Sequence, residues 1–75
     1  MDVCKIDYNG EIIFIVKNSI DSVVISTDTI RKDTGSVLLH VILNNSNHFF
    51  RFMDIKKAVL VASMLLEEGY NEISI

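Results

Sequence analysis

The sequence predicts an α+β protein, in which a single, mostly antiparallel sheet of five to six strands carries one C-terminal helix on one face. Three observations predict this class. Residues 1–52 are rich in Ile and Val and alternate apolar with polar residues, which is the period of β-strands. Residues 54–68 have helical spacing instead, and a short alternating segment follows them. A chain of 75 residues is too short for two domains, so we expect one domain over residues 1–75, in the order β-β-β-β-β-α-β.

A hairpin is predicted near the N-terminus, because Asn9-Gly10 separates two alternating segments and both residues tolerate the positive φ of a two-residue turn. The turn sets Tyr8 opposite Glu11 and fixes the register of the pair. The return strand, Glu11–Lys17, also has an apolar second face, which carries Ile12, Phe14 and Val16. We therefore expect this strand to be central in the sheet or covered by another element.

Three further strands are predicted between polar turns, at Ser22–Arg31, Ser36–Leu43 and His48–Phe52. Each of them is preceded by a polar turn, at Asn18-Ser19, Lys32–Gly35 and Asn44–Asn47 in order. The strand Ser36–Leu43 is the most apolar of the three, and both of its faces carry large aliphatic side chains. These strands continue the antiparallel meander.

The single helix is expected to begin after Asp54, whose carboxylate suits an N-cap, and to run to about Glu68. Gly69 follows as the residue that ends it in a left-handed turn. Asn71–Ile75 is the last strand. If a strand–helix–strand crossover stays within one sheet, His48–Phe52 and this strand are parallel or near neighbours.

More apolar surface is present than one helix on one sheet face can bury. The expected buried stripe of the helix consists of Ile55, Ala58, Val59, Ala62, Leu65 and Leu66. Three large apolar residues fall outside this stripe: Leu60, Val61 and Met64. Because a chain of this size is only marginally stable alone, we expect the surplus to serve a homodimer or another protein partner, with a tightly wrapped monomer as the alternative. The predicted interaction surface comprises Leu60, Val61, Met64, Glu67, Glu68, Ile12 and Phe14.

The charges at the two ends of the helix oppose its dipole. Lys56 and Lys57 lie in the first turn, and Glu67 and Glu68 lie in the last. An antiparallel pair of helices would bring basic and acidic ends together. The alternatives are a solvated surface and an anion or nucleotide site, in which Arg51 joins the two lysines at the helix N-terminus.

Catalytic, metal and cofactor sites are not expected. His40 and His48 are predicted to be ordinary strand residues, and Cys4 a buried, reduced thiol. No Gly-rich phosphate loop or metal-binding spacing is present. If the helix covers Phe50 and Phe52, then Phe49 and Arg51 share an open sheet face with His40.

The function expected from these features is that of a small, non-catalytic protein-interaction module that acts as a homo-oligomer. Its Ile, Asn and Lys usage is typical of AT-rich bacterial or phage genomes, so an inhibitor or regulator of a host macromolecule encoded by a phage or mobile element is the working hypothesis. The alternative is a small oligomer that sequesters an anionic ligand or nucleotide through Arg51, Lys56 and Lys57. No signal peptide or membrane span is evident, which predicts a cytoplasmic protein, and a net charge of −3 disfavours nucleic acid as a partner.

Overall fold

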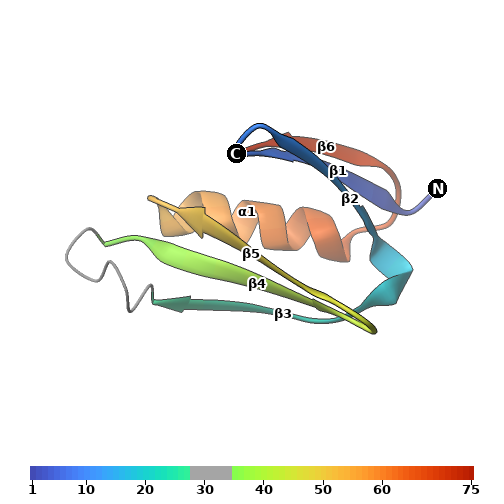
Figure 1. Ribbon diagram of the computed structural model, residues 1–75, viewed down its shortest axis with the longest axis horizontal. Coiled ribbons are helices and arrows are strands. Elements are labelled where there is room, and N and C mark those ends of the chain that lie inside the picture. Colours follow the sequence, from blue (N-terminus) through green and yellow to red (C-terminus); the bar gives the residue numbers. More distant parts are fainter. Residues whose placement is uncertain (28–34) are drawn as a thin grey trace.

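The computed structural model describes residues 1–27 and 35–75 and contains six strands and one α-helix (Figure 1). The elements are β1 (Val3–Tyr8), β2 (Glu11–Val16), the 3₁₀ turn η1 (Lys17–Ser19), β3 (Ile20–Thr27), β4 (Val37–Leu43), β5 (Asn47–Phe52), α1 (Ile55–Leu66) and β6 (Asn71–Ser74). The α+β class and the order of elements are confirmed. The prediction of a single sheet is wrong, because the strands form two three-stranded sheets, in the orders β2-β1-β6 and β3-β4-β5.

The first sheet contains the predicted hairpin. Asn9 and Gly10 have φ values of 51° and 78°, and Tyr8 pairs with Glu11. Strand β6 then joins β1 in parallel, so the expectation that β5 and β6 are neighbours in one sheet is wrong. The expectation that β2 is central or covered is also wrong, because β2 is an edge strand and the face that carries Ile12, Phe14 and Val16 is more than half exposed.

The second sheet is the predicted antiparallel meander. Strand β4 lies in its centre and pairs with β3 on one side and β5 on the other. The end of the predicted strand Ser22–Arg31 and most of the predicted turn Lys32–Gly35 lie outside the described residues. Gly35 itself has a φ of 73°, as that turn requires.

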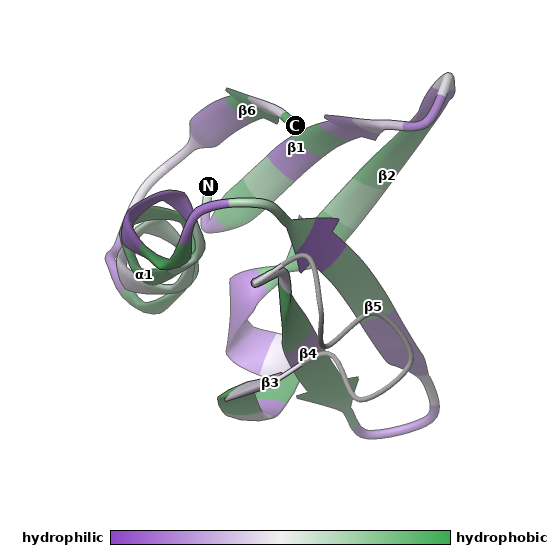
Figure 2. Ribbon diagram, turned by 90° about the vertical axis from the view of Figure 1, so that its left-hand side faces the viewer, coloured by the Kyte–Doolittle hydropathy of each residue, from purple (hydrophilic) through white to green (hydrophobic). Residues whose placement is uncertain are grey.

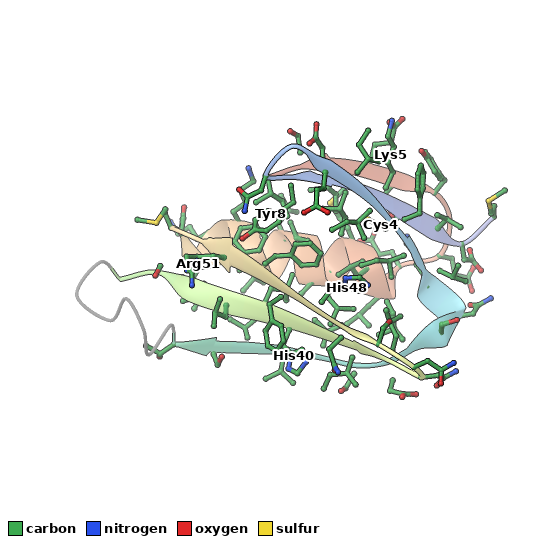
Figure 3. All side chains as sticks on the ribbon, in the orientation of Figure 1. Cys4, Lys5, Tyr8, His40, His48 and Arg51 are labelled. Carbon is green, nitrogen blue, oxygen red and sulfur yellow. The ribbon has the colours of Figure 1, made fainter. Side chains whose placement is uncertain are left out.

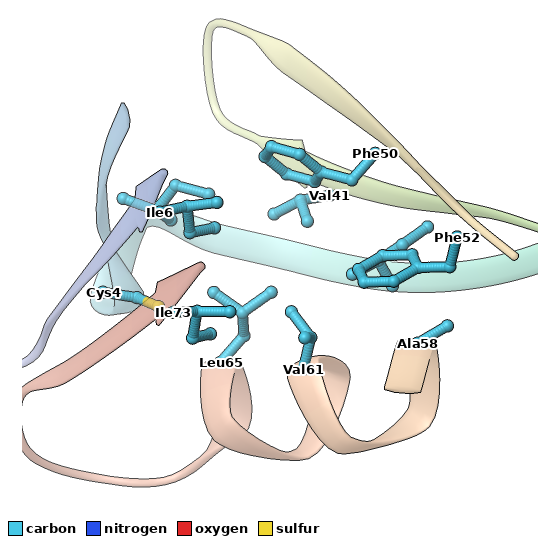
Figure 4. Close-up of a cluster of buried hydrophobic side chains, with 11 residues drawn as sticks. Cys4, Ile6, Val41, Phe50, Phe52, Ala58, Val61, Leu65 and Ile73 are labelled. Atoms are coloured by element: carbon cyan, nitrogen blue, oxygen red, sulfur yellow. The ribbon is translucent and has the colours of Figure 1, made fainter. Parts of the chain in front are cut away.

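The two sheets separate at η1, where the chain turns between β2 and β3, and they share one hydrophobic core with α1 (Figures 1 and 4). Each sheet turns one apolar face to this core, and the helix closes the open side. The buried apolar residues are Cys4, Ile6, Ile15, Leu39, Val41, Phe50, Phe52, Ala58, Val61, Leu65 and Ile73. A hydrogen bond joins the sheets directly, since the amide of Arg51 in β5 donates to the Tyr8 hydroxyl at 3.0 Å.

The helix begins as predicted and is rotated from the predicted orientation. The Asp54 carboxylate accepts from the Lys56 amide at 2.9 Å, and the helix ends at Leu66, two residues before the predicted end. Gly69 has the expected positive φ, 98°. The residues that α1 buries are Ala58, Val61 and Leu65. No helix in the described parts of the chain, residues 1–27 and 35–75, is long and apolar enough to cross a membrane.

Candidate functional site

Strand β2 presents three large apolar side chains at the edge of the first sheet. Ile12, Phe14 and Val16 alternate along the strand and are 57%, 61% and 51% exposed. In a two-residue hairpin the residues that flank the turn exchange hydrogen bonds, and the pattern then alternates. The backbone N–H and C=O groups of these three residues therefore point away from β1, toward the open edge.

The edge formed by β2 lacks the features that usually protect an edge strand. Its pairing with β1 runs without a register shift, and the strand contains no Pro and no charged residue after Glu11. An open pocket of about 290 Å³ lies beside its C-terminal half, between Phe14 and the turn that joins β4 to β5. Of the predicted interaction residues, Ile12 and Phe14 thus lie together on an accessible edge, although the reasoning that made β2 central was wrong.

The outer face of the second sheet forms a separate surface (Figure 3). The rings of His40 and Phe49 stack with centroids 4.1 Å apart, and His40 Nε2 lies 3.0 Å from Asn47 Oδ1. Phe50 and Phe52 are buried on the opposite face, as expected. Because His40 pairs with Phe49 and Leu38 pairs with Arg51, these residues share the face opposite Phe50 and Phe52, as predicted, and Phe49 is exposed on it.

The exposed side of helix α1 differs from the predicted one. Leu60 is 59% exposed, whereas Val61 is 1% exposed and belongs to the core. Met64 is partly buried against that core. The prediction that Val61 contributes to an interaction surface is wrong, and the reason is the rotation of the helix, which exposes Ile55, Val59 and Leu66 instead.

The three basic residues predicted to bind an anion are only partly brought together. Arg51 and Lys57 line one open pocket of about 300 Å³, together with Asp54. Lys56 is exposed and does not line this pocket. The Asp54 carboxylate already accepts from the helix N-terminus, so it both occupies an amide and adds a negative charge there.

Lys17 has a structural role that the sequence analysis missed. It is 8% exposed, and its ammonium donates to the Glu67 carbonyl at 2.9 Å and to the Asn71 side-chain oxygen. It thereby supplies the positive charge that the helix C-terminus lacks in its own last turn. Asp2 completes the contact, accepting from the Gly69 amide at 2.8 Å. The predicted interaction residues Glu67 and Glu68, at this end of the helix, are exposed.

The surroundings of Cys4 and His48 do not favour a catalytic or metal-binding role. Burial raises the pKa of the Cys4 thiol, and the Lys17 ammonium opposes this effect only in part. A thiol of this kind is a poor nucleophile. His48 is half-buried, and its ring stacks on that of Phe50 with the two ring centroids 6.2 Å apart. Within residues 1–27 and 35–75, no three His, Cys, Asp or Glu side chains gather as metal ligands do.

Comparisons of this chain with protein-family models, with curated protein sequences and with solved structures found no match.

Proposed function

We propose that this protein is a non-catalytic interaction module that binds another protein and works as a homo-oligomer. The observation that carries the proposal is strand β2, an edge strand whose outward side chains Ile12, Phe14 and Val16 are all apolar and more than half exposed. Contiguous exposed apolar residues typically mark protein–protein contacts. An unprotected edge is a template for pairing with a strand of another chain.

The mode of binding that fits this edge is strand addition. An extended segment of the partner would pair with the outward backbone groups of β2, and its alternate side chains would lie beside Phe14. The partner would therefore be a protein with an exposed, apolar, extended segment. Occupying such a segment is one way in which a small protein inhibits or regulates a larger one.

The test is a quantitative comparison of partners captured by the wild-type chain and by Phe14→Lys. The matched control is Val24→Lys, which adds the same charge to an exposed apolar position on β3, another edge strand. Aromatic anchors at the centre of an interface commonly contribute about 2 kcal/mol or more, so the affinity of the purified partner should fall at least about 30-fold for Phe14→Lys. Equal binding by the wild type and Phe14→Lys, both folded by circular dichroism, would contradict the proposal.

A second candidate function is binding of a small anion, favoured by the pocket that Arg51 and Lys57 share. Calorimetric titration with inorganic phosphate and with nucleotides tests it. Lys57→Ser should abolish the binding, whereas Lys56→Ser, the neighbouring lysine outside the pocket, should leave it unchanged. Absence of heat with the wild type would eliminate this candidate.

A further inference from the structure

The exposed side of helix α1 carries an apolar seam, formed by Ile55, Val59, Ala62 and Leu66. These residues are spaced by four, three and four positions, which is the spacing that places side chains along the contact line of two packed helices. Ile55, Val59 and Leu66 are 55%, 49% and 69% exposed, whereas Ala62, at the border of the seam, is partly buried against the core. The core contacts of the helix are made by a different side, through Ala58, Val61 and Leu65.

The Leu66 end of the seam lies beside the start of β3. Leu66 and Ile20, the first residue of β3, border the same open pocket. Figure 2 shows α1 at the opposite side of the core from β2. A contact along the seam therefore leaves the β2 edge accessible.

The charges beside the seam are arranged for a second copy of the same helix. Lys56 and Glu67 stand on one flank of the seam, because eleven residues are close to three helical turns. Lys56 is near the positive end of the helix dipole and Glu67 near the negative end, so each is unfavourably placed in its own helix. In an antiparallel pair each of them would lie near the favourable end of the other helix.

We infer that two copies of this protein pair through the seam, with their α1 helices antiparallel about a twofold axis. Ile55 packs against Leu66 of the second copy, and Val59 packs against its Ala62, whose small side chain lets the helices approach closely. Lys56 lies on the same side as Glu67 of the second copy. This inference rests on the proposed function, because it names the surface and the partner of the homo-oligomer.

The first test is the solution mass by light scattering and sedimentation equilibrium over a dilution series. The wild type should be a dimer that Val59→Lys converts to a monomer, with a dissociation constant raised at least about 30-fold. The matched control is Leu60→Lys, the adjacent exposed position outside the seam, which should leave the dimer intact. If circular dichroism shows that Val59→Lys does not fold, Leu66→Lys replaces it, since Leu66 is more exposed.

The second test reverses the charges. Lys56→Glu and Glu67→Lys should each weaken the dimer about five- to tenfold, and the double variant should recover wild-type affinity. The melting temperature of the monomer should rise for each single variant, because each reversal improves the match between the charge and its own helix dipole. In a parallel pair Lys56 and Glu67 of the second copy lie at opposite ends of the two helices and cannot pair, so unchanged affinities would overturn the antiparallel arrangement.

The remaining outcomes separate this inference from the proposed function. A wild type that stays monomeric at millimolar concentration overturns the inference and the homo-oligomeric part of the proposed function, whereas partner binding by the β2 edge is decided by the Phe14→Lys comparison. A dimer that survives Val59→Lys and is lost on Phe14→Lys also overturns it, because self-association then uses β2.

Discussion

Replacing Lys17 with Met should lower the free energy of unfolding by about 3 kcal/mol, because it removes two hydrogen bonds from a charged group and the positive charge at the end of α1. The Lys17 ammonium donates to the Glu67 carbonyl and to Asn71, and the side chain is almost fully buried. Met keeps the length and the apolar stem of the lysine. The two acceptors lose their donor, and part of this loss is offset because a charge no longer needs to be desolvated.

This loss is large for a small protein. A chain of 75 residues is expected to have a free energy of unfolding of roughly 4–11 kcal/mol, at about 0.05–0.15 kcal/mol per residue. Since 1 kcal/mol corresponds to about 4–8 °C at this size, the melting temperature should fall by roughly 10–25 °C. The measurement is urea unfolding at 25 °C followed by far-UV circular dichroism, with a thermal scan alongside.

Lys5→Met is the matched control. The Lys5 ammonium lies 3.3 Å from the Glu72 carboxylate, and the two side chains are 35% and 63% exposed. An exposed pair of this kind contributes about 0.2–1 kcal/mol, so Lys5→Met should remain close to the wild type. Equal losses for the two variants, or a loss below about 0.5 kcal/mol for Lys17→Met, would refute the reasoning, since such a change is ordinary for a surface position.

Three further changes test the core, the joint between the sheets and the orientation of the helix. Because burial raises the pKa of the Cys4 thiol, the unfolded chain loses the thiol proton first, and the free energy of unfolding should fall as the pH rises above about 8.5, by at most about 1.4 kcal/mol per pH unit. The free energy of unfolding, measured in urea from pH 7.5 to 10, should fall with pH more steeply for the wild type than for Cys4→Ala. The same pH dependence in the two proteins would contradict this. Tyr8→Phe removes the acceptor of the Arg51 amide, so hydrogen exchange at that amide should be faster and the free energy of unfolding should fall by about 1 kcal/mol. Unchanged exchange would mean that the hydroxyl does not join the sheets. In urea unfolding, Val61→Ala should lower the free energy of unfolding by about 1–3 kcal/mol and Leu60→Ala by less than about 0.5 kcal/mol. The buried stripe predicted from the sequence leaves both residues outside the core, so similar small losses would favour that orientation instead.

Local signals predicted the elements well because the interactions that define them are close in sequence. The turn at Asn9-Gly10 has two residues, so its backbone conformation alone sets the register of Tyr8 with Glu11. Asp54 likewise needs only the amide two residues later to cap the helix.

The partition into two sheets had no local signal. Strand β6 pairs with β1, so Asn71 lies beside Cys4 from the other end of the chain. The crossover rule predicts handedness when both strands belong to one sheet, and here the helix leads from one sheet to the other. Nothing in the residues of β5 or β6 distinguishes the two cases.

The orientation of the helix and the role of Lys17 were missed for related reasons. The helix has large apolar residues on more than one side, so periodicity alone does not separate Val59 from Val61. The space between two sheets selects the buried side. Lys17 follows a strand, where a charged residue is ordinary, and only the tertiary fold brings it to Glu67. For the predicted surface, Ile12, Phe14 and Leu60 are exposed and Val61 is buried.

The two proposed surfaces, taken together, make a prediction that neither makes alone. A dimer through α1 would carry two β2 edges, because α1 and β2 lie on different sides of each copy. Binding of a second edge to an immobilised partner is then intramolecular, and avidity commonly strengthens such binding by about 100-fold or more. Val59→Lys should therefore weaken retention on a surface densely coated with the partner, although it leaves β2 untouched. Its affinity for a single partner molecule in solution, measured by calorimetry, should equal that of the wild type. If Val59→Lys lowers both the retention on the surface and the affinity in solution, Val59 contacts the partner directly. If it lowers neither, the dimer does not present both edges.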